Sequence, residues 1–350
     1  MGGGHVGEAI GATILGCFGP RLRPDERSFF AQAQPWGFIL FARNLETPDQ
    51  ARRLTDSLRD AVGRDVPILI DQEGGRVQRI GPPHWRQYLP PLDQVAATGQ
   101  HSARAMYLRF RLIAAELLNI GIDVNCAPMC DIAEDCTHAF LRNRCYGTDA
   151  TAVTDNARAA AQALMDGGVL PVMKHMPGHG RAFVDSHLTL PVVHDDAETL
   201  RTRDFAPFRA LNHLPMAMTA HIVYTAFDAA QPATTSAVMN DLMRNELGFD
   251  GLMMSDDISM QALSGDLAER CRATLASGCD LTLHCSGDLG EMVEVVEASG
   301  ALQGPSLQRA EAALAARCAP QPLDIAVCEA ELARLLEAPA SMVLNEAGHG

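Results

Sequence analysis

Short apolar runs alternate with longer amphipathic segments along most of the chain, and this alternation limits the possible folds more than any other feature. Eight runs have the length and composition of buried strands. They cover residues 9–18, 37–41, 66–70, 122–127, 169–173, 216–220, 251–254 and 281–284. Parallel strands need a crossover connection, usually a helix. The sequence therefore predicts an α/β fold.

The segments between these runs have helical periodicity, and several begin at a residue that can cap a helix. They cover residues 48–61, 103–118, 150–165, 197–211, 236–247 and 267–276. Gly121, Gly167, Gly248 and Gly278 each follow one of these segments, where a left-handed C-terminal turn is easiest for glycine. The residues after Pro322 are also predicted to be helical.

The number of strand and helix pairs favours a closed barrel over an open sheet. Eight strands that alternate with helices match a (β/α)8 barrel. A dinucleotide-binding sheet remains possible on alternation alone, but no GxGxxG follows any of the strands. The length of 350 residues allows one large domain or two modest ones. Without a linker or an internal repeat, we predict one single-domain (β/α)8 barrel over residues 1–350.

Charge and cysteine content exclude several kinds of partner. The formal net charge of −15 disfavours nucleic acid and anionic membranes, and no apolar run is long enough to span a bilayer. No basic residue precedes the apolar stretch 9–18, so we expect a buried strand there and a cytoplasmic protein. The ten cysteines are scattered along the sequence, which indicates reduced thiols and not a disulfide scaffold. Cys126, Cys130, Cys136 and Cys145 lack the paired spacing of a zinc site, so no metal is expected.

Polar residues follow four of the predicted strands directly, at the end where barrel enzymes place their active sites. These residues begin at Asp71, Lys174, His221 and Ser255. Asp256 should stand at the barrel mouth, although an Asp after a strand can also cap the next helix. Because Asp257 suits the capping role better, we expect Asp256 to face the pocket.

The segment from Lys174 to His187 carries further candidates. Lys174 could donate to sugar hydroxyls, form a Schiff base or pair with a buried carboxylate. The dipeptide Lys174-His175 by itself does not distinguish among these three roles. The following PGHG predicts a tight loop. Asp185 could fix the tautomer of His187 and make it a proton shuttle, and a polar surface turn is the alternative.

Three more residues are candidate ligand-binding groups. Arg76 lies in a glycine-rich turn, and Arg144 lies in the segment RNRCYG. Surface arginines are commonly solvated, but the company of the other polar candidates favours contact with a ligand for these two. The carboxylate of Asp71 could accept hydrogen bonds from two neighbouring sugar hydroxyls.

Together these motifs resemble glycoside hydrolase family 3, and within it the bacterial single-domain β-N-acetylglucosaminidases. The matching segments are GFILFARN (37–44), IDQEGGRVQR (70–79), RCYG (144–147), KHMPGHG (174–180), DSH (185–187), PF (207–208) and SDDISM (255–260). By position, the resemblance implies that Asp256 is the nucleophile, His187 the general acid/base and Asp185 its orienting partner. It also implies a sugar-binding subsite formed by Asp71, Arg76, Arg144, Lys174 and His175.

The resemblance further implies a retaining exo-β-N-acetylhexosaminidase without a cofactor. Its expected substrate is a small carbohydrate, a muropeptide with terminal N-acetylglucosamine, cleaved in peptidoglycan recycling by a protein that we expect to be a monomer. A phosphorylase or a β-glucosidase of the same family is the nearest alternative. A Schiff-base aldolase on Lys174 and a non-catalytic sugar-binding barrel are alternatives from other classes.

Overall fold

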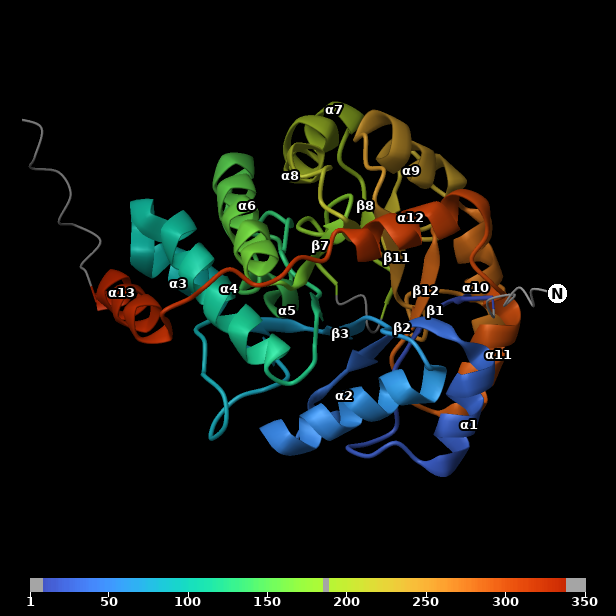
Figure 1. The fold of residues 1–350 in the computed structure, drawn as a ribbon. Coiled ribbons are helices and arrows are strands. Elements are labelled where there is room, and N and C mark those ends of the chain that lie inside the picture. The colour runs from blue at the N-terminus through green and yellow to red at the C-terminus, as the bar shows by residue number, and fades with distance from the viewer. Residues whose placement is uncertain (1–8, 185–188, 338–350) are drawn as a thin grey trace, which may run out of the picture.

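Parallel strands close into a barrel in a computed structural model, which describes residues 9–184 and 189–337. Within those residues the barrel has eight strands in the order β1-β12-β11-β9-β7-β6-β3-β2 (Figure 1). They are β1 (Gly11–Leu15), β2 (Pro35–Leu40), β3 (Ile68–Ile70), β6 (Val124–Asn125), β7 (Leu170–Met176), β9 (Met216–Thr219), β11 (Leu252–Asp257) and β12 (Leu281–His284). The predicted (β/α)8 barrel is confirmed.

Every predicted strand is present: β12 has the predicted bounds, and the others differ at one end or at both. β7 and β11 extend three residues beyond their predicted ends, so Lys174 and Asp256 belong to the strands themselves. β6 is shorter than the predicted run 122–127. The chain reaches Pro128 soon after this strand, and proline has no amide hydrogen with which to continue a ladder.

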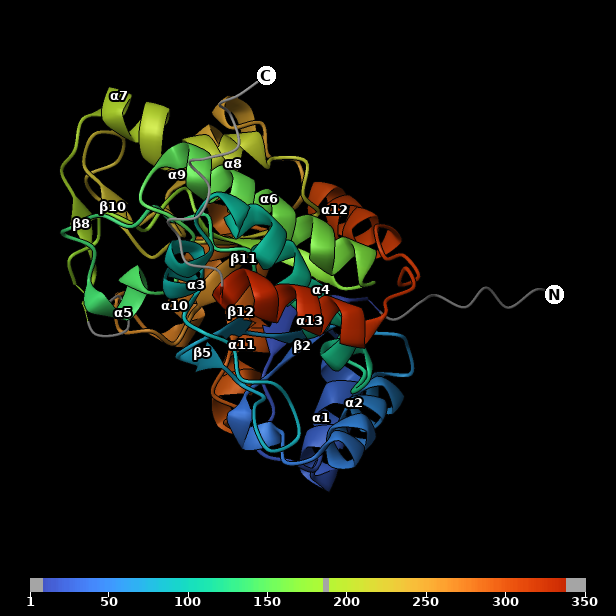
Figure 2. The same ribbon diagram turned by 90° about the vertical axis from the view of Figure 1, so that its left-hand side faces the viewer.

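Helices surround the barrel on its outside (Figures 1 and 2). The longer ones are α1 (Pro24–Ala33), α2 (Pro48–Val62), α4 (Ser102–Leu118), α6 (Ala150–Asp166), α10 (Leu267–Ala276), α11 (Leu289–Ser299) and α12 (Gly304–Ala315). Shorter ones are α3 (Pro91–Thr98), α5 (Ala139–Arg142), α7 (Ala197–Thr199), α8 (Ala206–Ala210) and α9 (Ala237–Asp241). π-helical turns at Leu200–Asp204 and Leu242–Glu246 interrupt two segments that were predicted as continuous helices.

Two small sheets that the sequence did not predict lie beside the barrel. β4 (Gln72–Gly74) and β5 (Val77–Gln78) form an antiparallel hairpin directly after β3. β8 (Val192–Val193) pairs in parallel with β10 (Val223–Tyr224). Their strands are too short for a periodicity to be visible in the sequence.

Strand residues alternate between two apolar clusters, which explains why the strands read as continuous apolar runs. On β2, Ile39 packs in the cluster inside the barrel with Trp36 and Ile14. Its neighbours Phe38 and Leu40 pack in the larger cluster between strands and helices. Both faces of each barrel strand are therefore buried.

One predicted helix end is corrected. Gly121, Gly248 and Gly278 adopt positive φ, as expected for glycines that follow helices. Gly167 has φ −84° and continues the right-handed turn of α6, and the next residue, Gly168, takes the left-handed conformation at φ +76°. The helix therefore ends one residue later than predicted.

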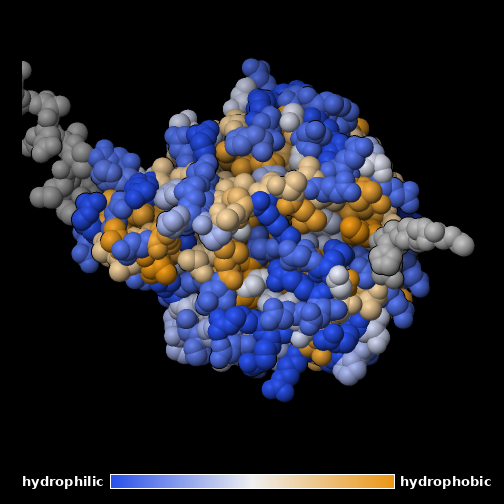
Figure 3. Space-filling model, in the orientation of Figure 1, coloured by the Kyte–Doolittle hydropathy of each residue, from blue (hydrophilic) through white to orange (hydrophobic). Residues whose placement is uncertain are grey.

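α13 (Ile325–Glu337) confirms the helix predicted after Pro322 and lies against α3 and α4 (Figure 2). It buries Cys328, Leu332 and Leu335. Figure 3 shows apolar surface over this helix, where Ile325 and Val327 are 43% and 62% exposed.

Across the described part of the chain, no helix is both long and apolar enough to cross a membrane.

Candidate active site

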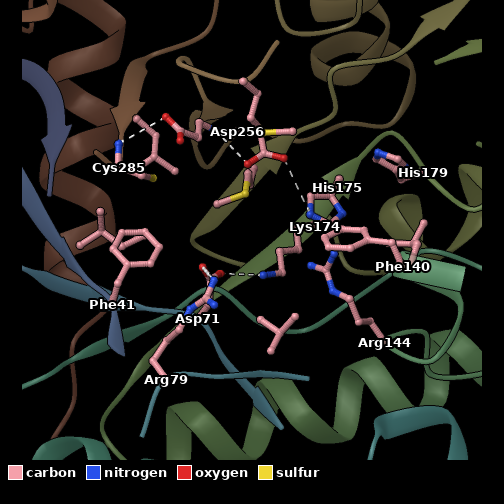
Figure 4. A pocket seen from close by; sticks show the side chains of 17 residues that line it. Phe41, Asp71, Arg79, Phe140, Arg144, Lys174, His175, His179, Asp256 and Cys285 are labelled. Carbon is pink, nitrogen blue, oxygen red and sulfur yellow. Dashed lines mark hydrogen bonds and ion pairs between the residues drawn. The ribbon is translucent and has the colours of Figure 1, made fainter. Parts of the chain in front are cut away.

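The C-terminal ends of the barrel strands surround a cavity, shown in Figure 4. Its lining includes Asp71, Arg144, Lys174, His175 and Asp256, all of them predicted site residues. They lie on or directly after β3, β7 and β11 or in the loop between α5 and α6. Barrel closure therefore gathers residues that are far apart in the sequence.

A cluster of paired charges forms one wall of the cavity. The Nζ of Lys174 lies 2.9 Å from Oδ1 of Asp71 and 2.6 Å from Oε1 of Glu73. Arg144 donates two hydrogen bonds of 2.9 Å to the Glu73 carboxylate. Arg79 donates to Asp71 at 3.0 Å. Residues 71–79 and the loop between α5 and α6 thus together hold Lys174 in place.

The electrostatics of this wall keep its groups ionised. Burial alone would raise the pKa of Glu73, but Arg144 and Lys174 outweigh it and lower that pKa to about 2. Burial alone would lower the pKa of Lys174, but Asp71 and Glu73 hold it above its usual value. A protonated amine with two carboxylate partners is a poor nucleophile, which argues against the aldolase alternative. Fixed ionic groups of this kind are suited to bind sugar hydroxyls.

A second chain of contacts leads from the interior to Asp256. His175 Nδ1 lies 2.8 Å from Oδ2 of Asp131, and His175 Nε2 lies 4.0 Å from Oδ2 of Asp256. Asp131 is fully buried and also accepts hydrogen bonds from the amides of His175 and His179. Burial would raise the pKa of Asp131, but the two histidines lower it. Asp131 therefore aims the His175 ring at the cavity.

Asp256 lies at the end of β11 with a side chain that is 19% exposed. Its Oδ1 accepts a hydrogen bond of 2.8 Å from the amide of Asp257. Asp257 also lines the cavity, and its carboxylate accepts from Ser259 and from the amide of Cys285. It holds the turn after the strand.

The expectation that Asp257 caps the following helix is wrong. That helix, α10, begins at Leu267, and its cap is Asp266, whose carboxylate accepts from the amide of Glu269 at 2.7 Å. Asp257 lies too far upstream, because β11 extends through it and a turn follows.

The arginine in the glycine-rich turn lies outside the cavity. Arg76 is exposed between β4 and β5, with its guanidinium 4.3 Å from the ring centroid of Phe140. Arg79, on the chain directly after β5, lines the cavity instead. The hairpin reverses direction at Gly74 and Gly75, both at positive φ, and this reversal returns Arg79 to the site. The binding of sugar by Arg76 stays a prediction without support from the cavity lining.

Glu73, Arg79, Asp131 and His179 complete the site and were not among the predicted site residues. Glu73 and Arg79 flank the predicted Arg76 and could have been found from the same motif. Asp131 comes four positions after the run 122–127, so the signal that identified Asp71, a polar residue directly after a strand, did not identify it. His179 is buried against the cavity, and burial and the nearby His175 lower its pKa to about 4.

Asp185 and His187 lie outside the described residues. On the chain before them, Arg181 forms ion pairs with Asp195 (2.6 Å) and Asp204 (2.8 Å).

Among residues 9–184 and 189–337, no group of three or more His, Cys, Asp or Glu could hold a metal ion.

Comparisons with known proteins agree with this geometry. Residues 9–314 match the model of the glycosyl hydrolase family 3 N-terminal domain. A curated beta-hexosaminidase of Methylococcus capsulatus is 37% identical over 273 residues, 77% of this chain and 80% of that protein.

Solved structures show the same likeness. A family 3 β-N-acetylglucosaminidase of Paenibacillus sp. superposes with a TM-score of 0.80 at 28% identity, over 96% of this chain and 64% of the other. NagZ from Neisseria gonorrhoeae, in complex with N-trifluoroacetyl-D-glucosamine, gives a TM-score of 0.76 at 27% identity, over 94% of this chain and 98% of the other.

Proposed function

This chain belongs to glycosyl hydrolase family 3 and is a glycoside hydrolase of the β-hexosaminidase type, and from that membership we propose that it is a retaining exo-enzyme with Asp256 as its nucleophile. The observation that carries the proposal is the position of Asp256, which faces the cavity opposite the charged cluster of Asp71, Arg79 and Lys174 (Figure 4). A carboxylate there can attack the anomeric carbon of a sugar whose hydroxyls the cluster holds.

The sugar that we propose is a terminal N-acetylglucosamine. NagZ from Neisseria gonorrhoeae, which is similar to this chain, was solved with an N-acylated glucosamine. We further propose that Asp71, Arg144, Lys174 and His175 bind the sugar, together with Arg79. The whole chain, residues 1–350, then acts as one catalytic domain.

His187 is proposed as the general acid/base, oriented by Asp185. In the described lining of the cavity the other carboxylates are already engaged, Asp71 by two cations and Asp257 by the turn after β11. The lowered pKa of His179, about 4, leaves its ring neutral near pH 7 and unable to act as an acid. A histidine supplied by the DSH segment fits the remaining role.

The reaction is tested with p-nitrophenyl glycosides. We expect release of p-nitrophenol from the β-N-acetylglucosaminide and none from the β-glucoside, with N-acetylglucosamine released first as the β-anomer. Asp256→Asn should lower kcat by about a thousandfold or more, since it removes the nucleophile. Asp266→Asn, which changes the exposed cap of α10, is the control.

Two results would contradict this proposal. An Asp256→Asn variant with kcat near that of the parent would exclude Asp256 as the nucleophile. Formation of N-acetylglucosamine 1-phosphate when phosphate is added would identify a phosphorylase instead.

Asp185→Asn should lower activity by orders of magnitude with an unchanged circular dichroism spectrum, because His187 would lose its orienting partner.

The natural substrate that we propose is a muropeptide, cleaved in the cytoplasm during peptidoglycan recycling. All ten cysteines lie within the described residues and are free thiols, as is usual in a reducing compartment. Beside the cavity, Arg76 stacks on Phe140 and forms no ion pair with a described carboxylate. An exposed guanidinium in a chain of net charge −15 is suited to an anionic leaving group.

This part is tested with N-acetylglucosaminyl-β-1,4-N-acetylmuramic acid and its methyl ester. We expect the acid to be the better substrate, and Arg76→Gln to lower kcat/KM for the acid alone. The preference should weaken at high salt, because exposed charges are screened. Arg53→Gln on α2 is the control for net charge, and equal turnover of acid and ester by the parent would contradict the anionic leaving group.

A further inference from the structure

A buried histidine behind the cavity connects β9 to the backbone beside Asp256. His221 follows β9 by two residues, is fully buried and is not among the residues that line the cavity. Its Nε2 lies 3.0 Å from the carbonyl oxygen of Asp257. Its Nδ1 lies 2.7 Å from the hydroxyl of Thr234. His221 therefore contacts the catalytic strand without access to the substrate.

The contact lies where the pairing of β9 with β11 has ended. Backbone pairing runs from Leu252 with Met216 to Met254 with Met218. β9 ends at Thr219, whereas β11 continues to Asp257. The pairing with β9 therefore stops before the Asp257 carbonyl, and a carbonyl oxygen can accept two hydrogen bonds. His221 provides one of these from a side chain.

The hydrogen-bond partners of His221 determine its tautomer. A carbonyl oxygen only accepts, so Nε2 carries the hydrogen. Burial lowers the pKa of His221, with Asp256 opposing it in part, so the ring is neutral near pH 7 and Nδ1 must accept. Thr234 has one hydroxyl hydrogen and two acceptors, Nδ1 at 2.7 Å and the carbonyl of Ala220 at 3.1 Å, and we assign the hydrogen to the nearer Nδ1. The Thr234 oxygen then accepts from the Thr219 hydroxyl at 2.9 Å. Hydrogen bonds thus run in one direction from Thr219 to the Asp257 backbone.

The residue whose carbonyl His221 contacts also donates to the carboxylate of Asp256. The amide of Asp257 donates to Oδ1 of Asp256 at 2.8 Å. The carbonyl of Asp257 also accepts from the amide of Met260 at 3.1 Å. A displacement of this residue would move the donor that orients the nucleophile, and a misplacement of about 1 Å can cost about a hundredfold in rate.

We propose that His221 is a positioning residue for the reaction: held as the Nε2–H tautomer by Thr234 and Thr219, it fixes the backbone of Asp257 through its carbonyl, and the amide of the same residue thereby aims the Asp256 carboxylate at the anomeric carbon. The inference rests on the proposed role of Asp256 as the nucleophile. It adds a residue that sits outside the cavity and acts only through the backbone of β11.

The test compares two replacements of His221 on the p-nitrophenyl β-N-acetylglucosaminide. His221→Met has a similar size without a donor, and His221→Gln keeps an N–H near the position of Nε2. We expect His221→Met to lower kcat about tenfold or more with KM within about twofold, and His221→Gln to recover most of the loss. Ser277→Ala, the control, removes a buried hydroxyl that donates to the Thr234 carbonyl at 2.9 Å. It should lower the melting temperature without lowering kcat.

The outcomes separate this inference from the proposed function. Parental kcat in His221→Met at a matched folded fraction would overturn the inference, and so would a His221→Gln variant as slow as His221→Met. If His221→Met does not fold, Thr234→Val and Thr234→Ser replace the pair, and equal kcat in these two overturns it. Asp256→Asn is assayed alongside: parental activity there would overturn both ideas, whereas an inactive Asp256→Asn beside unaffected His221 variants would overturn the inference alone.

Discussion

Buried histidines make the stability of this protein depend on pH. Burial lowers the pKa of His179, to about 4, and also lowers the pKa of His221 and His284. In the unfolded chain a histidine titrates near 6.5. Between these values the unfolded state binds more protons than the folded state, so stability is present above pH 6.5 and is lost as the pH falls toward 4.

The contribution of His179 can be measured by urea unfolding at pH 7.5 and pH 5. For this residue alone, the free energy of unfolding should be about 2 kcal/mol lower at pH 5. His179→Gln should remove that part of the difference, whereas His213→Gln, at an exposed position, should leave it unchanged. A His179→Gln variant with the parental difference would contradict the lowered pKa.

Two arginine–glutamate pairs of similar geometry differ in burial, and this difference predicts their effects. Arg144 and Glu73 are 7% and 0% exposed, whereas Arg201 and Glu246 are 42% and 34% exposed. Glu73→Gln leaves Arg144 without its buried counter-charge and Lys174 with Asp71 alone, and should cost about 3–5 kcal/mol of stability. Glu246→Gln should cost about 0–1 kcal/mol.

Glu73→Gln should also raise KM for the p-nitrophenyl substrate, because Lys174 and Arg144 lose the group that holds them. Chemical denaturation and steady-state kinetics measure the two effects. Similar losses of stability in Glu73→Gln and Glu246→Gln would mean that burial does not distinguish the pairs.

At the scale of elements, α13 is attached to the barrel by apolar contacts more than by charge. Leu332 is buried against α3 and α4, while the pair of Arg104 with Glu331 is partly exposed. Leu332→Ala should cost about 2–5 kcal/mol of stability, since it leaves a cavity. Val327→Ala on the exposed side of the same helix should change stability by less than about 0.5 kcal/mol.

Activity provides a second readout of this helix. α13 contributes no residue to the cavity lining, so kcat of Leu332→Ala on the p-nitrophenyl substrate should match the parent at a temperature where the variant is folded. Urea unfolding gives the stability. A large loss of kcat in the folded variant would contradict the separation of α13 from the active site.

At the scale of the whole molecule, two tryptophans report on different layers of the barrel. Trp36 is buried in the cluster inside the barrel, and Trp85 packs on the cluster between strands and helices. If residues 1–350 form one domain, the fluorescence of Trp36→Phe and Trp85→Phe should report the same urea midpoint, together with far-ultraviolet circular dichroism. Separate midpoints would show that the layers unfold independently.

The amino-acid sequence by itself determined the barrel and the edge at which its site lies. Apolar runs of strand length, separated by helical periodicity, have few other ways to bury both faces of each strand. The position of Asp71, Lys174 and Asp256 at the ends of such runs follows from the same pattern. These are local properties of the chain, so they can be read without a structure.

Only the tertiary structure decided which side chains meet. Glu73 binds Arg144 across 71 positions of sequence, and Asp131 binds His175 across 44. Arg79 rather than Arg76 lines the cavity because a hairpin of two very short strands reverses the chain. His221 reaches Asp257 because β9 ends earlier than β11. Register, strand length and burial set these contacts, and they arise only when distant segments pack together.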